Sequence, residues 1–198
     1  GHTYPGATAP YGAVQLSPDT RKGNWDACSG YHYSDSTLMG FSHTHLSGTG
    51  CIDLGDILFR PSLQTPLAFS HSDEKASSGY YSVNLREAGV LAELTTTPHV
   101  GIHRYTYKKG IEATLVVDMD HLLDNEYIYE GWVKQTGENE LTGMRRTRGW
   151  VDNQYVFFVA RFSQPFSSME QPSERQAVLT FDTTTGKPIV CKVGVSIV

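Results

Sequence analysis

Hydrophobic and polar residues alternate with a period of two over most of this chain. Residues 79–86 and 90–97 both show the pattern, and the run Glu87-Ala88-Gly89 between them is typical of a short hairpin loop. The last segment, 189–198, is the most regular. Its apolar face consists of Ile189, Cys191, Val193, Val195 and Ile197. Such alternation indicates strands with one buried face.

Similar patterns predict strands at about 99–107, 111–118, 127–136, 139–148, 154–163 and 175–182. Turn-forming residues separate them, as in Lys108-Lys109-Gly110 and Thr184-Thr185-Gly186-Lys187. Helical periodicity is absent except for a possible single turn at 122–127. About ten or more strands joined by short turns predict an all-β fold, a large antiparallel β-sandwich with little helix.

Length and charge exclude several classes of function. The chain has 198 residues, enough for one large domain with a substantial core. Its formal net charge is −5, and its basic residues are scattered apart from Arg145, Arg146 and Arg148. Nucleic acid is therefore not an expected partner, because phosphate binding needs clustered Lys and Arg. No apolar run of about eighteen residues is present, so we expect no membrane span.

The three cysteines do not form a disulfide scaffold, because their number is small and odd. Cys191 falls on the inward face of its predicted strand and is expected to be a small core residue. For Cys28 and Cys51 two possibilities stay open, a bridge in an oxidising compartment or two buried thiols, because sequence does not supply the geometry of a disulfide.

The first 60 residues are richer in Gly, Ser, His and Asp than the rest. Within them, residues 25–56 combine aromatic rings with carboxylates and imidazoles. A sugar ring has apolar C–H faces and a belt of hydroxyls, so a sugar-binding surface needs flat rings beside hydrogen-bonding groups. We therefore expect the working surface of the domain in its N-terminal third.

Trp25 and Asp26 follow Lys22-Gly23-Asn24, a loop-forming run, so we expect a turn to present the indole. A tryptophan on a loop with an adjacent carboxylate can stack on a pyranose and bind two of its hydroxyls. The alternative is an indole folded back on the edge of the sandwich.

Within 38–46, strand alternation would place Met39, Phe41, His43 and His45 on one face. Two imidazoles at this spacing can reach one ligand, and the spacing also suits a metal. Three interpretations stay open: hydrogen-bonded structural histidines, contacts to a sugar or a partner domain, and metal ligands. The metal interpretation is the weakest, because spacing fixes no third ligand.

Familiar catalytic signatures are absent, including HExxH, GxSxG and the P-loop. The run 47–51 is expected to form a tight turn. An acidic cluster follows a predicted strand and consists of Asp118, Asp120, Asp124 and Glu126. It lacks the glycine that a calcium loop needs, which favours a solvated acidic loop. No two carboxylates are singled out as the acid and base of a glycosidase.

A series of ordered motifs occupies the first 60 residues. The motifs are His2-Thr3-Tyr4-Pro5-Gly6-Ala7, Pro10-Tyr11-Gly12, Gln15-Leu16-Ser17-Pro18-Asp19-Thr20-Arg21, Trp25-Asp26, Cys28-Ser29-Gly30-Tyr31-His32-Tyr33, the run 40–51 and the run 53–57. This series resembles the start of glycoside hydrolase family 92, the calcium-dependent, inverting exo-α-mannosidases. Later strands match mainly in pattern, and the resemblance is specific because long ordered motifs rarely coincide by chance.

The resemblance implies a two-domain enzyme. Residues 1–198 would form its N-terminal β-sandwich, of the supersandwich type, and an (α/α)6 barrel absent from this chain would follow. The catalytic acid and base and most calcium ligands would lie on the barrel, so we expect no catalytic residue and no metal ligand here. The sandwich would dock the barrel and add loops to the cleft. Our candidates for substrate contact are Trp25, Asp26, Cys28, His43 and His45.

The sequence thus predicts the N-terminal domain of an exo-acting, inverting α-mannosidase that trims mannose-containing glycans in the periplasm or as a secreted enzyme. Alone, the domain is expected to be inactive. One alternative is a free-standing carbohydrate-binding module, which would bind mannosides by itself. Another is a metallohydrolase built on His43 and His45.

Overall fold

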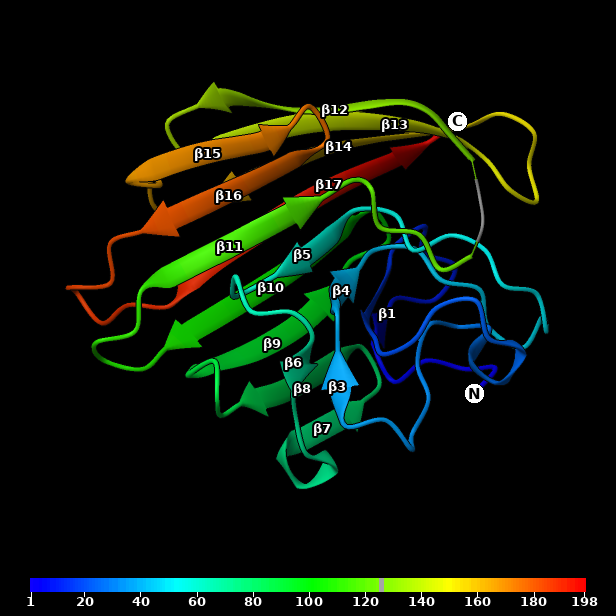
Figure 1. Ribbon diagram of the computed structural model, residues 1–198, viewed down its shortest axis with the longest axis horizontal. Helices are drawn as coiled ribbons and strands as arrows, with labels where there is room; N and C mark the ends of the chain where they lie inside the picture. The colour runs from blue at the N-terminus through cyan, green and yellow to red at the C-terminus, as the bar shows by residue number, and fades with distance from the viewer. Residues whose placement is uncertain (125–126) are drawn as a thin grey trace.

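The computed structural model describes residues 1–124 and 127–198. Two large sheets face each other, and a two-stranded ribbon lies beside them (Figure 1). Every strand pair in the described residues is antiparallel. The predicted antiparallel β-sandwich is therefore confirmed.

The first sheet has seven strands. In spatial order they are β1 (Ala7–Thr8), β2 (Gln15–Asp19), β4 (Gly40–Ser42), β5 (Leu58–Arg60), β11 (Ala113–Asp118), β16 (Gln176–Phe181) and β15 (Ser168–Ser173). The second sheet has eight strands. They are β12 (Tyr127–Gly137), β13 (Glu140–Arg148), β14 (Gln154–Phe162), β17 (Ile189–Ile197), β10 (Val100–Tyr107), β9 (Val90–Thr96), β8 (Tyr80–Leu85) and β7 (Glu74–Ser77).

The remaining elements are short. Strand β3 (Thr37–Leu38) pairs with β6 (Leu67–Ala68), and two single turns of 3-10 helix are η1 (Trp25–Ala27) and η2 (His71–Asp73). In the described part of the chain, no helix has the length and apolar character needed to cross a membrane.

The alternation in sequence corresponds to the two faces of the strands. On β17, Ile189, Cys191 and Val193 point inward and are buried, as predicted, whereas Ile197 at its end is exposed. Leu85 pairs with Val90 across the β8–β9 hairpin, so the predicted loop at 87–89 is confirmed. The expected strands between 79 and 198 begin and end within two residues of the observed ones.

The core lies between the two sheets. Phe41 and Phe59 project from the seven-stranded sheet, and Tyr81 and Tyr105 project from the eight-stranded sheet; all four are buried. The rings of Phe41 and Tyr81 meet with centroids 6.4 Å apart. Burying each such side chain contributes about 1.5–3 kcal/mol relative to leaving it exposed, so these contacts hold the two sheets together.

Two sequence expectations differ from the structure. The strand expected at 38–46 is interrupted: β3 and β4 cover only 37–38 and 40–42. Six strands of the described residues were not predicted: the short strands β1, β2, β5, β6 and β7 in the first 78 residues, and β15, whose residues are mostly exposed and polar and show no alternation. The helical turn expected at 122–127 includes residues 125 and 126, which lie outside the described residues.

Loops gather at one end of the sandwich. Segments 20–36, 43–57, 119–124 and 149–153 all lie at this end, and both chain termini lie on the same side (Figure 1). Long loops on a rigid double sheet are a common way to position binding groups.

Candidate functional site

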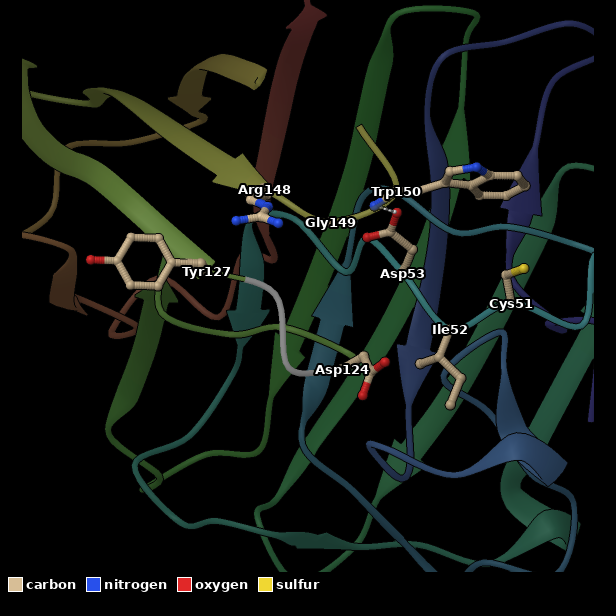
Figure 2. A pocket seen from close by; sticks show the side chains of 8 residues that line it. All are labelled: Cys51, Ile52, Asp53, Asp124, Tyr127, Arg148, Gly149 and Trp150. Carbon is tan, nitrogen blue, oxygen red and sulfur yellow. Dashed lines mark hydrogen bonds between the residues drawn. The ribbon is translucent and has the colours of Figure 1, made fainter. Parts of the chain in front are cut away.

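Three stretches of the chain, far apart in sequence, line a surface cavity of about 490 Å³ at the loop end. Figure 2 shows the side chains around it. The lining residues are Cys51, Ile52, Asp53, Asp124, Tyr127, Arg148, Gly149 and Trp150. The size falls within the range of small-molecule sites.

Asp53 holds two of these stretches together. Its carboxylate accepts the backbone N–H of Trp150 at 2.8 Å and that of Leu54 at 2.9 Å (Figure 2 shows the bond to Trp150). The Asp53 side chain is buried, whereas Trp150 is 65% exposed. Asp53 therefore fixes the backbone at the start of loop 149–153, while the indole of Trp150 stays exposed and can contact a ligand.

Trp25 lies beside the cavity on helix η1. Asn24 caps this turn by accepting the Asp26 N–H at 2.8 Å. The indole is 64% exposed and meets the ring of His2 edge-on, with centroids 5.3 Å apart. A Cβ at Gly50 would lie 3.0 Å from the indole, so the ring rests on the loop that leads into the cavity. The structure thus presents Trp25 from a turn, with Asp26 exposed next to it; contact with a sugar stays a prediction.

Cys28 lies beneath this turn rather than on the surface. It is buried, and its thiol donates to the Trp25 carbonyl at 2.8 Å. The structure has free thiols at Cys28, Cys51 and Cys191, of which Cys51 is exposed. Cys28 therefore supports the Trp25 turn from below, and the substrate contact predicted for it has no exposed surface to act through.

We expect one thiol to react quickly with Ellman's reagent in the native chain, because only Cys51 is exposed. Burial raises the pKa of the Cys28 and Cys191 thiols, which further slows their reaction. Two more thiols should react after unfolding in urea. The variant Cys51→Ser should show no fast thiol. If instead the native chain has none and the unfolded chain has one, a Cys28–Cys51 bridge is present.

His43 is a core residue. Its ring is fully buried; Nδ1 donates to the Ile57 carbonyl at 2.7 Å, and Nε2 lies 3.0 Å from Nε2 of His103 on β10. Burial lowers the pKa of His43 to about 4 and that of His103 well below its ordinary value, so both rings are neutral at pH 7. The expectation that His43 contacts a sugar is corrected, because the interior position excludes it.

His45 lies on the opposite face of the seven-stranded sheet, so the predicted common face with His43 is wrong. Its Nε2 lies 3.1 Å from Oγ of Ser42. Ser42 follows Phe41 in β4 and therefore points away from the core that Phe41 and His43 enter. His45 is also buried, which excludes the surface contact predicted for it.

The partner of His45 is Asp19, which the sequence did not single out. Asp19 Oδ1 lies 2.7 Å from Nε2 of His45, and Oδ2 lies 2.8 Å from Nε2 of His121. Burial raises the pKa of Asp19, but the charge of His45 and the hydrogen bonds from both histidines outweigh it and hold the pKa well below its usual range. Asp19 is thus an ionised carboxylate in the interior.

Within residues 1–124 and 127–198, no group of three or more His, Cys, Asp or Glu side chains is placed to hold a metal ion. His43 and His45 do not converge, since they lie on opposite faces of a sheet. The resemblance places calcium in the longer enzyme, with most of its ligands outside this chain, and that placement stays a prediction.

The acidic cluster divides among different roles. Asp118 accepts the Asp120 N–H at 2.8 Å, and the Asp120 carboxylate pairs with Nε of Arg175 at 2.5 Å. Asp124 lines the cavity, and Glu126 lies outside the described residues. The expected solvated acidic loop is thus only partly observed, because Asp118 and Asp120 have protein partners.

Sequence reasoning missed Trp150, Tyr127 and Arg148. The argument used for Trp25 also applies to Trp150, because Gly149-Trp150 falls between the predicted strands 139–148 and 154–163. Tyr127 and Arg148 carried no such signal, since both lie at strand ends in ordinary alternating segments.

The cavity is suited to binding a polar ring compound. Trp150 offers an exposed ring, Arg148 offers donors, and Asp124 offers an acceptor; the exposed indole of Trp25 lies outside the cavity, on the adjoining loop. Both oxygens of Asp53 already accept backbone N–H groups, which favours a structural role over proton transfer.

Comparison with known proteins gives a consistent result. The family model for the glycosyl hydrolase family 92 N-terminal domain matches residues 1–196. A family GH92 α-mannosidase from Bacteroides thetaiotaomicron, solved in complex with mannoimidazole, superposes with a TM-score of 0.89 and 34% identity, over 99% of this chain and 30% of that chain.

Two further relatives are more distant. A family GH92 inverting mannosidase from Bacteroides thetaiotaomicron VPI-5482 superposes with a TM-score of 0.78 and 23% identity over 99% of this chain and 29% of that chain, a likeness of fold. A protein of Arthroderma benhamiae, described as an uncharacterized secreted glycosidase, is 27% identical over an alignment of 146 residues; the match covers 63% of this chain and 19% of that protein. The chain thus spans less than a third of the length of these relatives.

Proposed function

Because this chain belongs to the family of glycosyl hydrolase family 92 N-terminal domains, we propose that it is the N-terminal β-sandwich of a longer, exo-acting, inverting α-mannosidase. In this proposal, its loop end contacts the terminal mannose of the substrate and docks the catalytic domain. The substrates are mannose-containing glycans outside the cytoplasm, in the periplasm or the surrounding medium. The secreted glycosidase among the relatives supports that location.

The observation that carries the proposal is the cavity beside Trp25. Its walls combine the exposed indole of Trp150 with the carboxylate of Asp124 and the guanidinium of Arg148, which suit the C–H faces and the hydroxyls of a pyranose. The indole would orient the sugar and exclude water from one side of it, while Asp124 and Arg148 bind hydroxyl groups. Trp25 and Asp26 extend this surface along η1.

The reactive groups are proposed to come from the rest of the protein. Inverting hydrolysis needs an acid and a base carboxyl about 6.5–9.5 Å apart. Asp53 is engaged by backbone N–H groups, which leaves Asp124 as the free carboxylate among the cavity residues. The C-terminus lies at the loop end, where a following domain would cover the cavity (Figure 1). We therefore propose that the 198-residue chain alone is inactive, and we assign calcium no ligand in it.

Calorimetry tests this proposal against a free-standing binding module. We expect the Kd of mannobiose for the 198-residue chain to be above about 1 mM, because half of the pocket is supplied from outside the chain. Binding at about 1 μM would contradict the proposal and favour the module, since that affinity requires a self-contained binding face.

The substitution Trp25→Ala in the full-length protein tests the substrate contact. We expect kcat/KM for an α-mannoside to fall at least about tenfold, because the exposed indole would no longer stack on the sugar. Trp132→Ala removes the same side chain from β12, outside this cavity, and should leave kcat/KM within about twofold. If Trp25→Ala and the wild type have equal kcat/KM, Trp25 does not contact the substrate.

A further inference from the structure

The carboxylate of Asp19 lies where three loops of the cavity end meet. Asp19 is the last residue of β2 and is fully buried. It binds His45, in loop 43–57, and His121, in segment 119–124, through different oxygens. A Cβ on Gly30, in loop 20–36, would lie 2.5 Å from Oδ1 of Asp19, so that loop also packs directly against the carboxylate.

Hydrogen bonding fixes the orientation of the His45 ring. Nδ1 of His45 lies 2.7 Å from the Gln15 carbonyl, and Nε2 lies 2.7 Å from Asp19. Both ring nitrogens thus have protein partners, so Gln15 and Asp19 fix the orientation of the ring. The His45 ring also contacts Tyr4, with centroids 5.2 Å apart.

The three loops are further linked to one another. The N–H of Leu123 donates to the Leu54 carbonyl at 3.2 Å, and the N–H of Gly23 donates to the Leu123 carbonyl at 2.7 Å. Each loop presents a residue to the proposed sugar surface: Trp25, Asp53 and Asp124. All three loops contact the Asp19 carboxylate.

We propose that Asp19 is a positioning residue of the sugar surface, which fixes the relative placement of Trp25, Asp53 and Asp124 through His45, His121 and Gly30. This inference rests on the proposed function for its kinetic consequence. Its structural consequence, the joint ordering of three loops, is independent of any activity.

The main test is Asp19→Asn, which keeps the size of the side chain and removes its charge. In this variant one amide oxygen replaces two acceptors, so only one of His45 and His121 keeps a hydrogen-bond acceptor at this position. We expect kcat/KM for an α-mannoside in the full-length protein to fall about 100-fold, because displacement of binding groups by about 1 Å has effects of that size. Cys28, buried in loop 20–36, should also become reactive, so two thiols instead of one react quickly with Ellman's reagent.

A second pair of variants keeps the test valid if Asp19→Asn does not fold. His121→Gln retains an N–H that can reach Asp19 and should keep most of the activity, whereas His121→Ala removes the donor and should resemble Asp19→Asn. The control is Leu85→Ala, a core truncation at the β8–β9 hairpin that lowers stability without touching the three loops. It should keep one fast thiol and wild-type kcat/KM at a temperature where it is folded.

The outcomes separate the two proposals. If the full-length wild type does not cleave α-mannosides, the proposed function fails, and the thiol count still decides whether Asp19 orders the loops. If Asp19→Asn has one fast thiol and matches Leu85→Ala in kcat/KM, the positioning role is overturned. If His121→Gln and His121→Ala behave alike, the hydrogen bond to Asp19 has no such role.

Discussion

Replacing Arg145 with methionine is expected to destabilise the chain by about 3–5 kcal/mol, because it leaves a buried carboxylate without its partner. Arg145, on β13, is fully buried. Its Nη2 donates to Oδ1 of Asp56 at 2.5 Å, and its Nη1 donates to the carbonyls of Met119, at 3.0 Å, and His121. The substitution removes the counter-charge and three hydrogen bonds at once.

The second oxygen of Asp56 adds to this cost. Oδ2 accepts from the hydroxyl of Thr44 at 2.6 Å and from the side-chain amide of Gln154 at 3.3 Å. Asp56 is therefore held in place by groups that cannot neutralise it. In Arg145→Met the carboxylate stays in the interior with hydrogen-bond donors but no positive charge, which is the costly half of a broken buried pair.

Urea unfolding at pH 7 measures this effect. The matched control is Arg104→Met, which breaks an ion pair with Glu93 on the same sheet; Arg104 is 53% exposed, so a loss of no more than about 1 kcal/mol is expected. The double variant Arg145→Met/Asp56→Asn removes the stranded charge and should recover part of the lost stability. A change in Arg145→Met no larger than that in Arg104→Met would contradict the prediction.

Much of the scaffold could be predicted from the sequence, because one face of each long strand packs on a continuous core. On β8 and β9, for example, Tyr81, Val83, Ala92 and Leu94 are all buried. The apolar positions of the alternating pattern in these strands are therefore the buried positions. Strand β15 shows no such alternation, because five of its six side chains are exposed and Met169 is the one that packs against the core.

The site was harder to predict, because its polar residues are defined by distant partners. His43 meets His103, 60 residues away; Asp19 meets His121, 102 residues away. A histidine that binds a ligand and one that completes a buried network look alike in sequence. Trp25 was placed well because its signal is local: a loop-forming run precedes it.

Lowering the pH from about 6.5 to 4 is expected to reduce the stability of the chain by about 3 kcal/mol through the buried histidine pair. The hydroxyl of Tyr105 donates to Nδ1 of His103 at 2.8 Å, Nε2–H of His103 donates to Nε2 of His43, and Nδ1–H of His43 donates to the Ile57 carbonyl. Every donor has an acceptor only while both rings are neutral. A third proton would place two N–H groups against each other.

The sign follows from the pKa values. His43 has a pKa of about 4 in the folded chain and about 6.5 when unfolded, so the unfolded chain binds the extra proton first and stability falls as the pH drops through this range. Burial also lowers the pKa of His103 and His121, which adds to the effect in the same direction. Asp19 acts at lower pH: its pKa is held below that of an unfolded aspartate, so its contribution is lost only below about pH 4.

Two glutamines can replace the pair without titrating. In His43→Gln/His103→Gln, one amide N–H can donate to the Ile57 carbonyl, the second amide can donate to the first, and its oxygen can accept from Tyr105. Urea unfolding between pH 7 and 4 should therefore show a much flatter profile for the double variant than for the wild type. His99→Gln, at an exposed histidine, should keep the wild-type slope. An unchanged slope in the double variant would assign the acid sensitivity to other groups, with His121 as the remaining buried histidine whose pKa burial lowers.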